Sequence, residues 1–94
     1  LTAAVLFSSL ASVSFAGDAA AGKAKSMTCA GCHGTNGISK NSMWPNLAGQ
    51  KQAYLASSLQ MYRDGRRMNA MMSAMAKNLT DADIANLAAY YSSL

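Results

Sequence analysis

The sequence predicts an all-α domain with about three main helices. Apolar residues recur at helical spacing in the longer segments, and residues typical of helix starts and stops flank those segments. No segment alternates apolar and polar residues with the β-branched enrichment that is typical of a strand. With 94 residues, the chain has the length of one small domain.

Residues 1–16 resemble a secretory signal peptide. The stretch is apolar and uncharged, and its last residues, Ser14-Phe15-Ala16, are typical of a cleavage site before Gly17. Its charged n-region and an initiator Met are missing. An apolar run of about 15 residues is shorter than the roughly 20 that a spanning helix needs. We therefore expect a signal peptide at 1–16, a domain at 17–94, and a mature protein that does not span a membrane.

The first helix is expected over residues 18–27, running into Cys29. This segment is rich in alanine and lysine, which favour helix, and Asp18 is placed to cap its N-terminus. A second helix is expected between Gln50 and Asp64, with Gly65 as its stop signal. Its apolar positions are Tyr54, Leu55, Leu59, Met61 and Tyr62.

The third main helix is expected after Thr80-Asp81-Ala82-Asp83, which has the form of a capping box with Asp in place of the usual Glu. Its apolar positions follow the helical spacing i, i+3, i+4 and i+7, and they are Ile84, Leu87, Ala88 and Tyr91. Between the helices, a polar loop follows His33 and runs through Ser42. It ends where the segment Trp44–Gly49 begins, which contains Pro45, the only proline.

Cys29-Ala30-Gly31-Cys32-His33 is the attachment pattern of a c-type haem. Two thiols three residues apart can reach the two vinyl groups on one edge of the porphyrin. The histidine that follows can then give the iron its proximal imidazole ligand. The sequence therefore predicts one covalently bound haem per chain, held by Cys29 and Cys32, with His33 on the iron.

Three alternative roles for the two cysteines require features that the sequence lacks. A zinc site needs four ligands, but Cys29, Cys32 and His33 are the only cysteines and histidine. A thioredoxin-like redox pair is expected beside a βαβ pattern, which is absent. A structural disulfide would close a very short loop and so would constrain the unfolded chain little.

The function depends on what occupies the second axial position of the iron. A protein ligand there is typical of electron transfer, whereas an open position allows binding and chemistry at the iron. Without a second histidine, the thioether of a methionine is the expected donor, because a lysine ligates only after losing its proton. Four methionines recur at helical spacing, and they are Met68, Met71, Met72 and Met75. The same spacing is typical of a core stripe on one helix, and spacing alone does not identify a ligand.

Several segments together resemble the small soluble class I c-type cytochromes of bacteria over essentially Gly17 to the end. The matching segments are Cys29–Gly34, Pro45–Gln50, Tyr54-Leu55, Met71-Met72, Leu79–Ile84 and Leu87–Tyr91. The resemblance implies a small cytochrome c-type fold, with the helices wrapped around the haem. It also implies a periplasmic electron carrier that turns over no substrate.

The resemblance also implies roles for individual residues. Counting back from Leu79 as the family pattern does makes Met72 the first choice for the distal ligand and Met71 the second. The carbonyl of Pro45 would accept a hydrogen bond from the other nitrogen of His33. The haem crevice would be walled by Trp44, Tyr54 and Tyr62, and Gly22 would mark the crossing of the first and last helices. One departure is Ala74, where relatives often have proline.

The charges suit a redox protein partner with an acidic docking surface. Eight Lys and Arg against four Asp and Glu give a net charge of +4, although a solvated, solubilising face would account for this excess equally well. No basic run with interleaved aromatic residues suggests nucleic-acid binding. The alternative function is a haem-based enzyme or gas-binding sensor domain with an open distal position.

Overall fold

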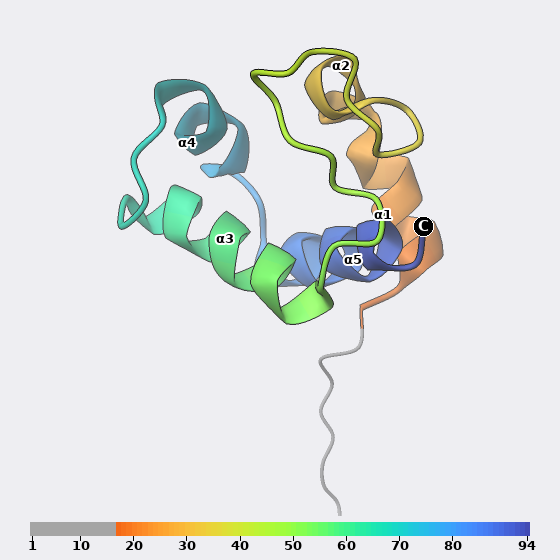
Figure 1. Ribbon diagram of the computed structural model, residues 1–94. Helices are drawn as coiled ribbons and strands as arrows, with labels where there is room; N and C mark the ends of the chain where they lie inside the picture. Colours follow the sequence, from red (N-terminus) through yellow and green to blue (C-terminus); the bar gives the residue numbers. More distant parts are fainter. Residues whose placement is uncertain (1–16) are drawn as a thin grey trace, which may run out of the picture.

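The computed structural model describes residues 17–94, which are folded into five α-helices and one 3-10 helix (Figure 1). These are α1 (Ala19–Lys25), η1 (Ser26–Thr28), α2 (Ala30–His33), α3 (Gln52–Asp64), α4 (Ala70–Ala76) and α5 (Asp81–Ser92). No strand occurs within this range, so the all-α prediction is confirmed. The three main helices correspond to α1, α3 and α5, and α2 and α4 are shorter additions. The expected signal peptide at 1–16 lies outside the described residues.

The first expected helix is built from α1, η1 and α2 in nearly continuous succession. Asp18 caps α1 as predicted, because its carboxylate accepts hydrogen bonds from the backbone N–H groups of Ala20 and Ala21 at 2.9 and 3.3 Å. The backbone N–H of Asp18 donates to Oδ1 of Asn86 at 2.8 Å. The start of α1 is therefore tied directly to α5.

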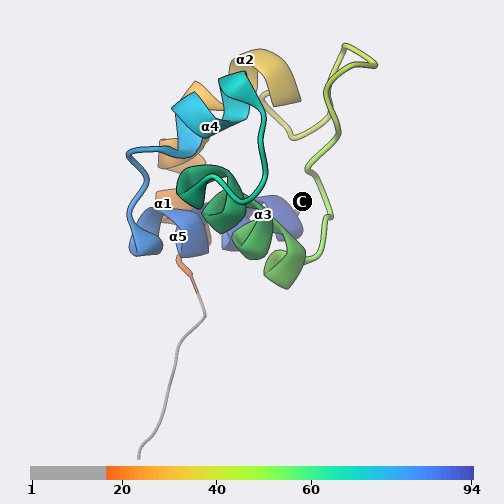
Figure 2. The same ribbon diagram turned by 90° about the vertical axis from the view of Figure 1, so that its left-hand side faces the viewer.

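Gly22 allows α1 and α5 to cross in close contact (Figures 1 and 2). Gly22 is buried, and a Cβ atom at this position would collide with the backbone carbonyl of Asn86 and crowd the Cβ of Tyr90. Because no side chain separates the two backbones here, the position requires glycine for space rather than for conformation. This close approach sets the geometry of α1, which leads into the haem motif, relative to α5, which carries most of the core.

The N-terminus of α5 is closed by the predicted capping box. The Asp83 backbone N–H donates to Oγ1 of Thr80, and the Thr80 backbone N–H donates to the Asp83 carboxylate, both at 3.0 Å. This backbone hydrogen bond lowers the pKa of Asp83, and Lys25 Nζ, 3.5 Å from the carboxylate, adds to the effect. Lys25 belongs to α1, so the ion pair is a second link between α1 and α5.

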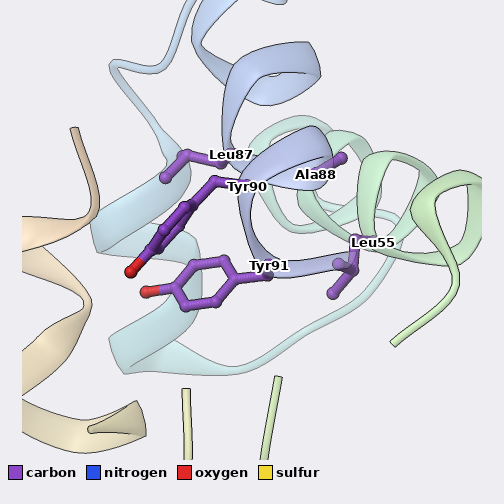
Figure 3. Packing of buried hydrophobic residues seen from close by; sticks show 5 residues of the cluster. All are labelled: Leu55, Leu87, Ala88, Tyr90 and Tyr91. Carbon is purple, nitrogen blue, oxygen red and sulfur yellow. The ribbon is translucent and has the colours of Figure 1, made fainter. Parts of the chain in front are cut away.

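The core is small and lies between α3 and α5 (Figure 3). It comprises Leu55, Leu87, Ala88, Tyr90 and Tyr91. The rings of Tyr90 and Tyr91 are 5.0 Å apart between centroids and tilted by 53°, and Figure 3 shows their hydroxyl groups pointing in the same direction. The Tyr90 hydroxyl donates to the carbonyl of Thr35 at 3.5 Å, and burial raises the pKa of Tyr91.

The loop between α2 and α3 is held against the helices by backbone hydrogen bonds. The carbonyl of Gly37 accepts from Leu47 and Ala48 at 2.8 and 3.0 Å, and Gly49 donates to the carbonyl of Tyr91 at 2.9 Å. These bonds cross the loop and attach it to α5. As a consequence, Pro45 is held at a defined place above the end of α2.

Gly65 ends α3 as predicted, in the left-handed conformation with a φ of 82°. The chain then turns back to α4, which packs on α3. Asn69 caps α4 by accepting from the backbone N–H of Met72 at 3.0 Å. Met68 precedes the helix and is 90% exposed, so a single helical stripe of all four methionines is wrong.

None of the helices within 17–94 combines the length and the apolar character that crossing a bilayer requires.

Candidate haem site

A cavity of about 490 Å³ opens between α2, the loop after it, α3 and α4. Figure 1 shows α2 and α4 on opposite sides of the region above α3 and α5. The chemically reactive or metal-ligating side chains along its wall are Cys29, Cys32, His33, Met43, Met71, Met72 and Met75, of which Met43 lies in the loop and is 81% exposed. Segments that are far apart in the sequence thus meet in one cavity.

His33 is the last residue of α2 and is buried. Its Nδ1 lies 2.8 Å from the carbonyl oxygen of Pro45. Because a carbonyl can only accept, Nδ1 carries the proton of this hydrogen bond, and in the neutral ring Nε2 keeps its lone pair. The imidazole is therefore oriented by the loop, and Nε2 is the nitrogen that can bind a metal.

Cys29 and Cys32 are partly buried free thiols on the cavity wall. Cys29 is the N-cap of α2 and Cys32 lies within its single turn, so the helix brings both sulfurs to the same side. Burial raises the pKa of the Cys29 thiol.

Besides Met43 in the loop, three methionines of α4 line the cavity on the side opposite α2. Met72 is half-buried, whereas Met71 and Met75 are 54% and 56% exposed. The Asn69 cap fixes the backbone of Met72 at the start of the helix. Met72 is therefore the most enclosed of the three thioethers.

The aromatic residues that were expected at the crevice also line this cavity, and they are Trp44, Tyr54 and Tyr62. Pro45 lies among them, with its carbonyl on His33. One lining residue was not foreseen. Arg67, in the turn between α3 and α4, lies over the Tyr62 ring at 4.6 Å and donates to Ser58 Oγ at 3.3 Å. Its sequence position, in a short basic run before the methionines, carries no signal for this placement.

The donor set fits a haem. A covalently attached porphyrin requires thiols for attachment, ligands for its iron and apolar surroundings. The cavity offers two thiols at one end, one oriented imidazole, thioethers facing it, and walls that are largely aliphatic and aromatic. A simple metal-ion site fits poorly, because no group of three or more His, Cys, Asp and Glu side chains occurs in the described part of the chain. The geometry therefore agrees with the chemistry that the haem motif predicts.

The family model for cytochrome c matches residues 19–94. The chain belongs to the cytochrome c family. It is a small class I c-type cytochrome, its cofactor is a covalently bound haem c with one iron, and its function is haem-based electron transfer.

Individual relatives agree with this assignment. Cytochrome c-554(548) of Halomonas halodenitrificans is 54% identical over 81 residues, which cover 83% of this chain and 98% of the relative. The thiosulfate dehydrogenase electron acceptor of Thiomonas intermedia is 43% identical over 76 residues, covering 80% of this chain and 35% of the relative. The solved cytochrome c4 structure of Acidithiobacillus ferrooxidans has a TM-score of 0.80 at 35% identity, covering 84% of this chain and 51% of that one.

The chain thus spans nearly the whole of one relative but only about a third to a half of the other two proteins. In this respect it corresponds to one part of the longer proteins.

Proposed function

We propose that residues 17–94 form a periplasmic one-electron carrier in which Cys29 and Cys32 hold the haem and His33 and Met72 bind its iron. The observation that carries this proposal is the meeting of two thiols, an oriented imidazole and a half-buried thioether in one cavity. When bound, the haem supplies an iron couple that accepts and returns a single electron. The protein residues supply its attachment, its axial ligands and its low-dielectric surroundings.

His33 is proposed as the proximal ligand because the Pro45 carbonyl already occupies Nδ1 and leaves Nε2 for the iron. This hydrogen bond prevents rotation of the ring and increases the basicity of the ligating nitrogen. Pro45 acts here through its backbone carbonyl. Its side chain, which has no donor, sits on the cavity wall beside Trp44.

Met72 is proposed as the distal ligand because it is the most enclosed methionine on the wall of α4. A thioether ligand at this position would keep the iron in the low-spin form and would raise its reduction potential. Met71 remains the second choice, because it is the adjacent residue and also lines the cavity.

If His33 and Met72 filled both axial positions, the iron would have no open site for a substrate, as a carrier rather than an enzyme requires. The named relatives support the same choice. One of them is described as an electron acceptor of a dehydrogenase, so a dehydrogenase is a chemically suitable class of electron donor for this chain. The competing function is an enzyme or gas sensor with an open distal position.

An absorption spectrum of the protein expressed from the full sequence behind a complete signal peptide, in a host that attaches c-type haem, tests the proposal. We expect haem in the periplasmic fraction, a mature N-terminus at Gly17, and haem that survives acid-acetone extraction. We also expect a low-spin oxidised form with the weak long-wavelength band of a thioether bound to iron(III).

The matched variant for this experiment is Cys29→Ser with Cys32→Ser, for which we expect complete loss of extraction-resistant haem. Covalent haem in the double variant would contradict the assigned attachment residues. A wild-type protein that is high-spin and binds carbon monoxide would instead support the enzyme or sensor.

We also propose that the redox partner has an acidic docking surface. Four lysines on the described surface are exposed and have no carboxylate within ion-pair distance, and they are Lys23, Lys40, Lys51 and Lys77. Lys40 is the one beside Trp44 in a second cavity of about 300 Å³, next to Cys32. The rate of electron exchange with the physiological partner should fall as ionic strength rises, since salt screens such contacts. A rate that is independent of salt would contradict this docking mode.

A further inference from the structure

The segment that carries the α4 methionines comprises residues 65–80 and is called the distal segment below. It leaves α3 at Gly65 and returns to the helical core at Asp81, where α5 begins. Figure 1 shows α4 on the other side of the cavity from α2, with the chain running back from α4 past α3 to α5. Among the helices, α4 packs mainly on α3. Because one helix gives most of this support, the position of the methionines depends on how firmly the two ends of the distal segment are held.

Backbone hydrogen bonds hold the first end of the distal segment. The N–H of Gly65 donates to the carbonyl of Tyr62 at 3.4 Å, and the N–H of Arg67 donates to the carbonyl of Met61 at 3.1 Å. Both bonds join residues that are close in the sequence, so they fix a local turn. They do not attach this turn to the other end of the segment.

Arg63, in the last turn of α3, reaches that other end. Its Nη1 donates to the carbonyl of Leu79 at 3.1 Å, 16 positions later in the chain, and lies 2.9 Å from a carboxylate oxygen of Asp81. The Arg63 side chain is 24% exposed, whereas the Asp81 side chain is 87% exposed. One guanidinium therefore joins the two ends of the distal segment across its base.

The contact with the Leu79 carbonyl is the stronger of the two. A hydrogen bond with a charged donor is among the stronger kinds in proteins, and this one is partly buried. An ion pair with the exposed carboxylate of Asp81 contributes less, because water and salt screen it. Leu79 also packs against the core cluster, so its carbonyl is a defined point of attachment for the segment.

We propose that Arg63 is a positioning residue for the distal ligand, because its bonds to Leu79 and Asp81 keep the distal segment closed with Met72 on the iron. The inference rests on the proposed function and deepens it. Opening of the segment would withdraw the methionine. The proximal histidine and the two attachment cysteines lie in other elements and would stay in place.

The open fraction of the molecules controls how readily an external ligand takes the distal position. The apparent dissociation constant of such a ligand is its intrinsic constant divided by the fraction that is competent to bind it. Imidazole is a suitable probe for the oxidised holoprotein, because its nitrogen can replace the thioether on the iron and the long-wavelength thioether band is then lost. Loss of this band with added imidazole therefore measures how easily the segment opens.

The test compares variants of Arg63 and of its exposed partner as oxidised holoproteins. We expect Arg63→Gln to bind imidazole about tenfold more tightly than the wild type, as the loss of one charge-assisted hydrogen bond implies. Arg63→Lys keeps the charge but not the planar fork, and it should bind about threefold more tightly. Asp81→Asn should change the affinity by less than about twofold, because Asp81 is exposed.

Two control variants separate this role from other effects of a substitution. Arg66→Gln removes the same charge, but Arg66 pairs with Asp64 at 3.0 Å within the turn that ends α3. Gly22→Ala disturbs the crossing of α1 and α5, which lies outside the distal segment. Both controls should keep the wild-type affinity for imidazole. A purely structural role for Arg63 would lower the free energy of unfolding and leave that affinity unchanged.

Hydrogen exchange of the backbone amides supplies a second readout that does not depend on an added ligand. We expect the amides of α4 to exchange about tenfold faster in Arg63→Gln than in the wild type, and those of α1 to exchange at the same rate in both. Arg66→Gln should match the wild type in both helices. This pattern would show that the distal segment opens while the helix before the haem motif stays closed.

An imidazole affinity of Arg63→Gln that is no higher than that of Arg66→Gln would overturn the inference. If Arg63→Gln fails to take up haem, the same comparison is made with Arg63→Lys. Either failure would leave the proposed function standing, provided that the wild-type protein shows covalent haem with the thioether band. A wild-type protein that lacks this band would contradict the proposed function itself.

Discussion

Replacing Met72 with alanine is expected to convert the low-spin haem iron into a high-spin form that binds carbon monoxide. The thioether of Met72 is the proposed distal ligand, and its removal leaves a position that alanine cannot fill. The long-wavelength thioether band of the oxidised protein should disappear, and the reduction potential should fall well below that of the wild type. Absorption spectra with and without carbon monoxide, together with a redox titration, measure these effects.

Met71→Ala and Met75→Ala are the matched controls, because both residues lie on α4 and line the same cavity. Both variants should keep the low-spin spectrum and the thioether band. If Met72→Ala keeps the band while Met71→Ala loses it, the ligand is Met71. If neither single variant loses it, methionine ligation by this pair is wrong.

Replacing Gly22 with alanine is expected to destabilise the holoprotein by about 3 kcal/mol. The added Cβ would collide with the carbonyl of Asn86, which belongs to the backbone of α5 and cannot move aside as a flexible side chain can. The two helices must then separate, and the Lys25 to Asp83 ion pair and the Asp18 to Asn86 hydrogen bond would be weakened with them. Denaturant unfolding followed by helix and haem signals measures the loss.

Gly31→Ala is the control for this substitution. Gly31 also lies in a helix, but a Cβ at this position meets no atom within 4 Å. Its replacement should be neutral or stabilising by up to about 1 kcal/mol, because alanine favours helix. A Gly22→Ala variant as stable as Gly31→Ala would show that α1 and α5 can move apart at little cost, which contradicts a tight crossing at Gly22.

The helix ends that carry a capping or stop signal in the three main helices were predictable because they depend on local chemistry. Asp18 caps α1, Gly65 ends α3 in a left-handed conformation, and Thr80 with Asp83 forms a capping box on α5. Each signal acts within about four residues, so the sequence neighbours alone determine it. The haem motif is predictable for the same reason, since a single turn of helix spans Cys29 to His33.

The methionine segment shows where local patterns are insufficient. Helical spacing suggested one stripe of four methionines, yet Asn69 starts the helix and leaves Met68 outside it. The pattern also could not show which of Met71, Met72 and Met75 is the most enclosed. The enclosure of Met72 compared with Met71 and Met75 depends on how α4 lies against α3, which is a tertiary contact.

The sequence alone was sufficient to predict the three main helices, the class of cofactor and the residues able to attach it. The reason is that short-range spacing controls capping, helix periodicity and the reach of two thiols to one porphyrin edge. Tertiary packing controls which side chains meet. The carbonyl of Pro45 reaches His33 through the folded loop, and Arg67 enters the haem cavity only because the turn after Gly65 reverses the chain over Tyr62. Such contacts depend on the relative placement of whole elements, and no local pattern encodes that placement.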